Sequence, residues 1–361
     1  MARTTVLSAA VAVLALALGH VATATAADPD PVGADRAGDP PTRTIEPARL
    51  ARGKDAAVDF MQDGVVHTAS GGTVAIRTPV TGEQRQLLGK SRKGWLVAVR
   101  KGYVSRVVAV RRGHRPVEVR RTRVTSYSDT AIGWRASRDG KVLISTVYDR
   151  GGSTRTVQDV SGKRRGSEYS TSYFSPLDAD AGHVVTYGEN KFYRLRVMDW
   201  VPRTSRTEIA NAASYVSLRD DLMFTRVRGR FYGPTSISAP AAPVWSQPIQ
   251  PLAVSPDGQA VAGLRIAGSG FNSPAILDVR RMDDGTLIDS IAFGERITMD
   301  NWELGKDHEQ TVAWESDDSV VLQLGSPRGA VLVRCDLEQE CERASDFGGN
   351  VSVPYETYVW W

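Results

Sequence analysis

The feature that most constrains this chain is a turn that recurs at regular intervals. Glycine or aspartate turns precede short apolar runs at Gly94, Asp139-Gly140, Gly182, Asp221, Asp257-Gly258 and Asp317-Asp318. Successive turns lie 45, 43, 39, 36 and 60 residues apart. A repeat of about 40 to 45 residues that carries several strands is typical of the blades of a β-propeller.

Two further observations complete the count of repeats. The last interval is long because residues 291–310 have the composition of an inserted loop, and an earlier turn at Asp63-Gly64 adds one more unit. We therefore expect residues 45–361 to form seven blades of four antiparallel strands, with six or eight blades as the alternatives. The C-terminal segment 351–361 is expected to supply the strand that closes the ring.

Between the turns the residues favour strands. The apolar runs are strand-length, and they are β-branched or alternate polar with apolar residues, as in 94–99, 141–148, 183–187, 319–324 and 330–333. No apolar stripe at helical spacing follows residue 27. The fold class is therefore all-β. A pair of β-sandwiches is the alternative, but it does not explain the regular spacing.

Several repeats share one turn-and-strand signature. Residues 253–262 contain a strand, a Ser-Pro-Asp-Gly turn and a second strand, and residues 275–288 supply a third and a fourth. Residues 134–140 and 193–199 follow the same pattern. These units resemble the WD40-like repeats of TolB-type β-propellers of the exported, actinobacterial-like bacterial kind. The resemblance spans residues 56–345 and implies the fold but no catalytic residues; the Gly-His and Trp-Asp dipeptides of typical WD40 blades do not recur.

The N-terminus has the order of a secretory signal peptide. Arg3 precedes an apolar stretch over 6–18 and a small-residue site, Ala24-Thr25-Ala26. The apolar stretch is shorter than the roughly 20 residues that span a bilayer. We expect residues 1–26 to be cleaved, residues 27–44 to be a flexible linker, and the mature chain to be secreted or extracytoplasmic with no transmembrane segment.

The chain has two cysteines, Cys335 and Cys341. An exported chain meets oxidising conditions, and an even pair this close predicts a disulfide that staples a hairpin. A zinc site is the alternative, but two thiols without nearby histidines are a poor zinc ligand set.

Sequence motifs of catalytic and cofactor sites are absent. There is no Gly-x-Ser-x-Gly, no His-Glu-x-x-His and no phosphate-binding glycine loop. The histidines after residue 26 are His67, His114, His183 and His308. The paired aspartates lack the full ligand series of a calcium loop and suit hairpin turns; they are Asp178 and Asp180, Asp283 and Asp284, and Asp317 and Asp318. We predict no catalytic residue, no metal and no cofactor.

Positive charge is concentrated in residues 90–123, where Glu118 is the only acidic residue, although the formal net charge of the chain is only +4. The candidate polyanion-binding residues are Lys90, Arg92, Lys93, Arg111, Arg112, Arg115, Arg120 and Arg121. Outside the cytoplasm the matching partner is a wall polymer or a lipid headgroup and not nucleic acid. The structural alternative is that outward cations keep a sheet edge soluble and unpaired.

Aromatic residues are a second candidate surface, with packing between blades as the alternative. They are Trp200, Phe231, Tyr232, Trp245, Phe271, Trp302, Trp360 and Trp361.

These observations favour a monomeric, non-enzymatic binding or scaffold module that presents one propeller face to a protein or cell-envelope partner. The alternative is an enzyme of lyase, lactonase or glycosidase type with its site at the mouth of the central channel. Converging carboxylates or a metal-binding cluster at that mouth would favour the enzyme. A purely structural envelope protein is a third possibility, for which the sequence holds no discriminating residue.

Overall fold

The computed structural model describes residues 39–76, 83–123, 131–149, 151–171, 174–189, 195–201, 206–210, 213–229, 231–265, 276–294, 312–337 and 340–354. Within these ranges the chain is almost entirely β-strand, and the helical content is limited to one 3-10 turn, η1 (Pro47–Arg49). The predicted signal peptide and most of the predicted linker lie outside the described residues. None of the described helical residues forms a helix long and apolar enough to cross a membrane.

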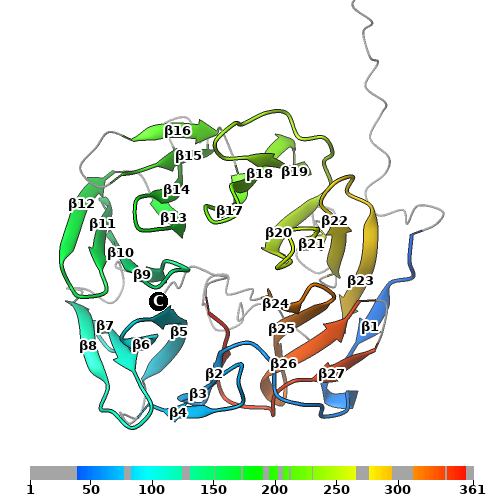
Figure 1. Ribbon diagram of the computed structural model, residues 1–361, viewed down its shortest axis with the longest axis horizontal. Helices are drawn as coiled ribbons and strands as arrows, with labels where there is room; N and C mark the ends of the chain where they lie inside the picture. Colours follow the sequence, from blue (N-terminus) through cyan, green and yellow to red (C-terminus); the bar gives the residue numbers. More distant parts are fainter. Residues whose placement is uncertain are drawn as a thin grey trace, which may run out of the picture. The chain divides into compact units, whose positions relative to one another are not determined.

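Seven sheets surround a central axis as the blades of a β-propeller, which confirms the predicted fold (Figure 1). Blade 1 contains β28 (Val351–Ser352), β2 (Phe60–Gln62), β3 (Val65–His67) and β4 (Thr73–Ala75). Blade 2 contains β5 (Gln84–Ser91), β6 (Gly94–Lys101), β7 (Val104–Val110) and β8 (Val117–Arg123). Blade 3 contains β9 (Ala131–Ala136), β10 (Val142–Asp149), β11 (Gly152–Asp159) and β12 (Arg164–Ser170).

The other four blades follow along the chain. Blade 4 contains β13 (Phe174–Ala179), β14 (Val184–Glu189), β15 (Leu195–Asp199) and β16 (Thr207–Ala210). Blade 5 contains β17 (Ala213–Ser217), β18 (Leu222–Arg228) and β19 (Phe231–Ser236), and Gln247 takes the fourth position by pairing with Tyr232. Blade 6 contains β20 (Ile249–Val254), β21 (Ala260–Arg265), β22 (Ile276–Arg281) and β23 (Leu287–Phe293). Blade 7 contains β24 (Val312–Ser316), β25 (Ser319–Ser326), β26 (Gly329–Asp336) and β27 (Cys341–Arg343).

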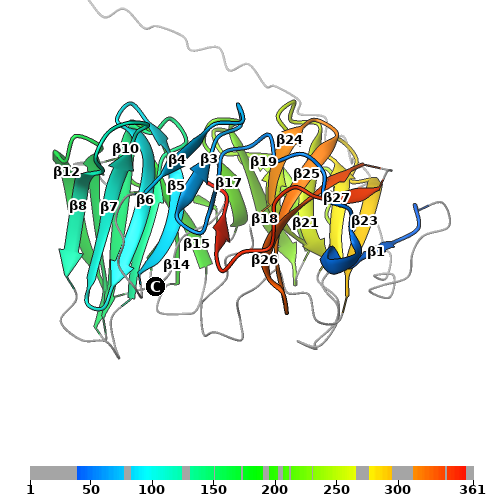
Figure 2. The same cartoon turned by 90° about the horizontal axis from the view of Figure 1, so that it is seen from below.

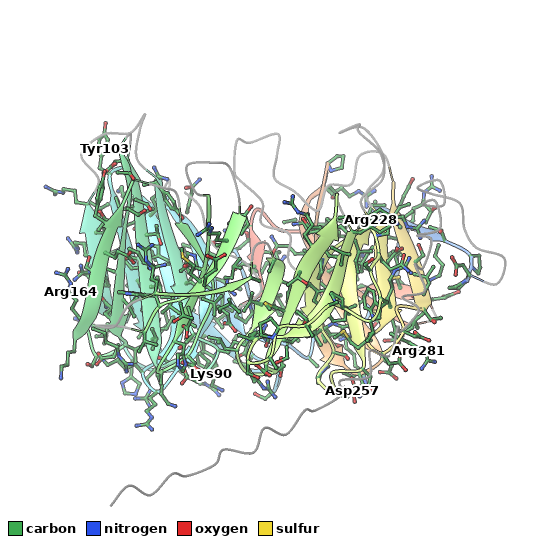
Figure 3. The ribbon with its side chains drawn as sticks, turned by 90° about the horizontal axis from the view of Figure 1, so that it is seen from above. Lys90, Tyr103, Arg164, Arg228, Asp257 and Arg281 are labelled. Atoms are coloured by element: carbon green, nitrogen blue, oxygen red, sulfur yellow. A yellow bond between two sulfur atoms is a disulfide. The ribbon has the colours of Figure 1, made fainter. Side chains whose placement is uncertain are left out.

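The strands of each blade run between the two faces of the ring (Figure 2). The first strand of a blade is innermost and the fourth is outermost, as β5 and β8 show in blade 2 (Figure 1). We call face A the face that carries the first-to-second and third-to-fourth turns, and face B the face that carries the second-to-third turns. Lys90 and Asp257 lie toward face A, whereas Tyr103 and Arg228 lie toward face B (Figure 3).

The ring is closed by pairing the two ends of the folded chain. In blade 1, Ser352 of β28 pairs with Met61 of β2, and Val351 pairs with Gln62. The predicted closing strand is therefore confirmed at its first two residues, while residues 355–361 lie outside the described part. Because β28 is the innermost strand, the Asp63-Gly64 turn joins the second and third strands of its blade and lies on face B, unlike the other counted turns.

An N-terminal strap (residues 42–57) crosses the outside of blades 6 and 7. Its strand β1 (Arg43–Ile45) pairs in parallel with β23, and β1 includes the last two residues of the predicted linker. The main chain of the strap then bonds to the outer strand of blade 7, where Gly53 N donates to Arg343 O at 2.9 Å. The strap therefore links the outer edges of the last two blades.

Residues 291–293 belong to a strand, contrary to the sequence-based expectation. They were expected to begin an inserted loop, but they end strand β23, where Ile291 and Phe293 are 0% and 1% exposed. Together with Leu287 these apolar residues face the core at strand spacing. Residues 295–311, which follow, lie outside the described part.

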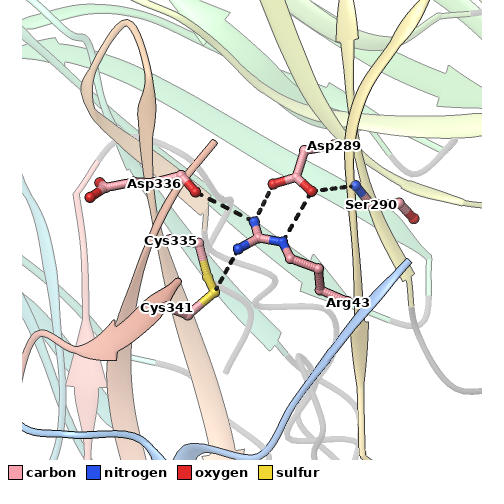
Figure 4. Close-up of a disulfide and its surroundings, with 6 residues drawn as sticks. All are labelled: Arg43, Asp289, Ser290, Cys335, Asp336 and Cys341. Atoms are coloured by element: carbon pink, nitrogen blue, oxygen red, sulfur yellow. Dashed lines mark hydrogen bonds and ion pairs between the residues drawn. A yellow bond between two sulfur atoms is a disulfide. The ribbon is translucent and has the colours of Figure 1, made fainter. Parts of the chain in front are cut away.

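The disulfide between Cys335 and Cys341 is present, as predicted, and joins directly paired residues of β26 and β27. Arg43 of the strap lies between this hairpin and blade 6 (Figure 4). Its guanidinium donates to the Asp289 carboxylate at 3.2 Å and to the Asp336 carbonyl at 3.4 Å. The strap, blade 6 and the disulfide hairpin of blade 7 are thus joined through one side chain.

Apolar residues pack mainly between neighbouring blades. Trp134 of β9 is fully buried against Leu96, Val107 and other residues of blade 2, and its indole N–H donates to Ser105 Oγ at 2.7 Å. Blade 6 contains a buried polar group instead. Its Asp278 is 0% exposed, and its carboxylate accepts hydrogen bonds from two arginines of the same blade.

The Ser-x-Asp-Gly turns close in the same way wherever they occur. In blade 6, Ser255 Oγ donates to the Asp257 carboxylate at 2.5 Å, and that carboxylate accepts the Gln259 N–H at 2.9 Å. In blade 3, Ser137 and Asp139 repeat the contact at 2.6 Å. The aspartates thus satisfy main-chain donors at the turn, which is why this short motif marks the blades.

Replacing Asp257 by asparagine is expected to lower stability at neutral pH, and this decrease should become smaller as the pH falls below the usual pKa of aspartate. The hydrogen bond from Ser255 and the Gln259 N–H hold the pKa of Asp257 below its usual value. The ionised carboxylate therefore adds stability above the unfolded-state pKa of about 3.9, and this stability is lost as the pH falls through the folded-state pKa. Urea midpoints at neutral pH and at low pH test this; equal decreases at both would contradict it.

Candidate functional site

On face A, blade 2 brings two basic turns together. Arg92 and Lys93 form the turn from β5 to β6, and residues 111–116 form the turn from β7 to β8. Gly94 adopts a φ of 117°, and a Cβ placed there would lie 2.6 Å from Cγ of Arg111. Glycine at this position therefore allows the two turns to touch. We call Arg92, Lys93, Arg111, Arg112 and Arg115 the basic cluster.

A pocket of about 310 Å³ lies between these turns. Its lining residues are Lys93, Ala109, Arg111, His114, Arg115 and Val117. Ala109 and Val117, which face each other across β7 and β8, supply apolar lining. Cationic side chains surround them, so the pocket suits an anionic group that carries some apolar surface.

The basic cluster is not neutralised by neighbouring acids. Within the described residues, none of its five side chains forms an ion pair, whereas Arg85 and Arg106 of the same blade share the carboxylate of Glu83 at 3.2 Å. The blade thus pairs cations along its strands and leaves those of its face A turns uncompensated. Uncompensated cations that converge attract anionic partners.

The remaining predicted residues lie apart from the cluster. Lys90 is the second-last residue of β5, and its ammonium lies 5.3 Å from the ring centre of Trp95. Arg120 and Arg121 lie on the outer strand β8. Arg121 pairs with Glu118 at 2.7 Å, and this hydrogen bond and charge raise the pKa of its guanidinium.

Blade 3 extends the basic surface beyond the eight candidate polyanion-binding residues, and one of the residues that it adds, Lys163, was noted in the sequence as part of a second basic group. Its face A turns carry Arg138, Lys141 and Lys163. Gly140, with a φ of 64°, packs so closely on the end of β5 that a Cβ there would lie 1.9 Å from Lys90 O. The turns of the two blades are therefore in direct contact, and the basic surface is continuous across them.

No family model matches the chain, and no curated protein matches it in sequence. Among solved structures, it is similar to the uncharacterised protein lmo1340 from Listeria monocytogenes, with a TM-score of 0.50 and 12% identity over 78% of this chain and 92% of that one. The β-propeller domain of Cps50 (Swd1) from Myceliophteria thermophila gives a TM-score of 0.46 and 11% identity over 74% and 88%. A putative TolB from Agrobacterium tumefaciens gives 0.38 and 14% over 84% and 95%.

At these identities the similarity concerns the fold alone. β-Propellers, a TolB among them, are thus found among proteins of similar structure, as the repeat signature suggested. That the chain is of the exported, actinobacterial-like kind stays a prediction.

The histidines and acidic turns show mainly structural contacts. His67 stacks on Phe60 with ring centres 4.4 Å apart, and buried Asp178 accepts the Leu218 N–H at 2.7 Å. Among the described side chains, no three of His, Cys, Asp or Glu lie close enough together to hold a metal ion. The expectations of no metal, no cofactor and no catalytic residue stay predictions. His308 lies outside the described residues.

Two of the candidate surface aromatics are packed inside the ring. Trp200 is 6% exposed, with the Arg155 guanidinium 4.5 Å from its ring centre. Trp245 is 9% exposed and donates its N–H to Met282 O at 2.9 Å. Packing between blades explains both. Phe271, Trp302, Trp360 and Trp361 lie outside the described part.

The sequence reasoning missed His114 and Val117 as pocket residues. Both lie within nine residues of Ala109 in the same hairpin, so the pairing of Ala109 with Val117 across a six-residue turn is the signal that finds them. The gathering of acidic turns on face A of blades 5 to 7 was also missed, because each pair of aspartates was considered by itself, as a calcium ligand or as turn residues.

Proposed function

We propose that this protein is an extracytoplasmic, non-enzymatic binding module whose basic cluster on face A holds an anionic protein or cell-envelope polymer. The observation that carries the proposal is that three exposed or half-exposed cations, Lys93, Arg111 and Arg115, line one pocket. The turns that form it also carry Arg92 and Arg112, and none of the five has an acidic partner among the described residues. Cations that only keep a surface soluble have no reason to converge on a pocket.

The basic stripe of the sequence divides into two parts with different roles. Arg120, Arg121 and Arg123 lie on β8, the outermost strand of blade 2, where charged side chains protect an edge from pairing with another chain. The structural alternative therefore accounts for these residues. It does not account for Arg111 and Arg112, which lie in a turn and have no strand edge to protect.

Two features support a location outside the cytoplasm. The disulfide between Cys335 and Cys341 suits an oxidising compartment. The first 26 residues have the pattern of a secretory signal peptide. In that location phosphodiester polymers and anionic lipid headgroups are the abundant polyanions. Both carry the negative charge that complements the cations of the basic cluster.

Reversing two charges of the cluster, with Arg111→Glu and Arg112→Glu together, is expected to weaken binding of poly(glycerol phosphate) by about 30-fold or more. A basic residue near an anionic surface contributes about 1 kcal/mol, and two of them correspond to that factor. Titration calorimetry at low and physiological ionic strength measures the effect, and the affinity of the unmodified protein should fall as salt is added.

The matched control reverses two cations on the opposite face, with Arg226→Glu and Arg228→Glu together. Both residues are exposed at the turn of blade 5 on face B, so the net charge changes equally while the cluster is untouched. The control is expected to bind like the unmodified protein. An affinity that does not change with salt, or that both variants weaken equally, would contradict the proposal.

A further inference from the structure

Charges of opposite sign occupy opposite halves of face A. The described turns of blades 2 and 3 on this face carry eight cations and one acid, namely Arg92, Lys93, Arg111, Arg112, Arg115, Arg138, Lys141, Lys163 and Asp139. The described turns of blades 5, 6 and 7 carry eight acids and one cation, namely Asp220, Asp221, Asp257, Asp283, Asp284, Asp317, Asp318, Glu340 and Arg219. We call these two areas the basic sector and the acidic sector.

The two sectors lie across the ring from each other. The midpoint of blades 2 and 3 and the centre of blade 6 are three and a half blades apart, which is half of the seven-bladed ring. Figure 3 shows Lys90 and Asp257 toward the same face on opposite sides of the ring. Between the sectors, the third-to-fourth turn of blade 1 (residues 68–72) has no charged residue.

A surface divided in this way is complementary to its own copy. A two-fold axis that lies in the plane of face A, perpendicular to the line joining the two sectors, places the basic sector of one molecule on the acidic sector of the other, and the reverse contact forms at the same time. We propose that face A is the interface of a face-to-face homodimer. This goes beyond the proposed binding function and departs from the monomer expected from the sequence.

Two charges of the acidic sector are held in place by hydrogen bonds. Asp221 accepts hydrogen bonds from Ser236 and Ser238, and Asp284 accepts one from the Thr286 N–H. These bonds keep the pKa of both carboxyls below its usual value. These two carboxylates therefore present fixed negative charges at neutral pH.

Face A also exposes an apolar side chain that a second copy would cover. Val117, the first residue of β8, is 56% exposed beside the basic cluster. Its burial would add a contribution that salt does not screen.

Light scattering and sedimentation equilibrium on the mature full-length protein test the dimer. At low ionic strength we expect twice the monomer mass, falling toward the monomer mass as salt is added. A basic-sector variant (Arg111→Glu with Arg112→Glu) and an acidic-sector variant (Asp283→Lys with Glu340→Lys) should each be monomeric alone. An equimolar mixture of the two should form a heterodimer, because one of its sector contacts joins two unmodified sectors and the other joins the introduced glutamates to the introduced lysines.

The outcomes separate this proposal from the binding function. A monomer at low ionic strength, or a mixture that stays monomeric, overturns the dimer. So does dissociation by the face B control, Arg226→Glu with Arg228→Glu. Poly(glycerol phosphate) binding by the acidic-sector variant, which keeps the basic cluster, reports on the binding function alone. In the unmodified dimer this polymer should act as a competitor and lower the mass toward that of the monomer.

Discussion

Replacing Trp134 by alanine is expected to lower the free energy of unfolding by about 3 to 5 kcal/mol. The side chain is 0% exposed between blades 2 and 3, and its N–H is bonded to Ser105 Oγ at 2.7 Å. Removing it leaves a cavity between two sheets, and also leaves the buried hydroxyl of Ser105 without its partner. Urea unfolding followed by circular dichroism measures the change.

Trp134→Phe is the matched control for that experiment. Phenylalanine retains much of the apolar volume and removes the N–H. This substitution should therefore lower the free energy of unfolding by less than alanine does, by about 1 to 3 kcal/mol. If both substitutions changed the unfolding midpoint by the same small amount, the contact between blades 2 and 3 would not be a main source of stability.

Replacing Asp278 by alanine is expected to have an effect of similar size, about 3 to 5 kcal/mol. Its carboxylate is 0% exposed and accepts bonds from Arg265 Nη2 at 2.8 Å and from Arg280 Nη2 at 3.0 Å. Without it, two largely buried guanidinium groups in one blade lose the negative charge between them. Removing one partner of a buried ion pair is more damaging than replacing the whole network by apolar residues.

Asp284→Ala is the control for the buried network. This exposed aspartate of the same blade accepts a hydrogen bond from its own turn, so its loss should lower stability much less than the loss of Asp278. A comparable decrease from the two substitutions, measured by urea unfolding at neutral pH, would show that the charge at Asp278 is unimportant to the fold.

The repeated turns could be predicted from the sequence because they are local. The contacts of Asp139 and Asp257 span only a few residues, so a short motif reveals the blades. Contacts between distant segments are different. The pairing of Arg43 with Asp289 spans 246 residues, and no motif at either position signals it. The first three residues of the strap, 42–44, were therefore included in the predicted linker, although the rest was expected in the propeller domain.

Ring closure explains the misplaced turn at Asp63-Gly64. The blade that contains it takes its innermost strand from Val351 and Ser352, so the position of a turn within this blade depends on residues at the other end of the chain. The candidate site could likewise be predicted only in part. The basic residues were visible in the sequence, but the pocket depends on the approach of two turns at Gly94 and Arg111.

The arrangement of blade 1 also sets an order of events during synthesis. A ribosome releases Val351 and Ser352 after every strand of blades 2 to 7, and until then the inner edge of β2 has no partner. Blades 2 to 6 can form earlier, since the main strands of each come from one continuous stretch of chain. The nascent chain therefore cannot close its native ring before residue 352 has been synthesised, which leaves a period in which it can still be threaded through a narrow channel.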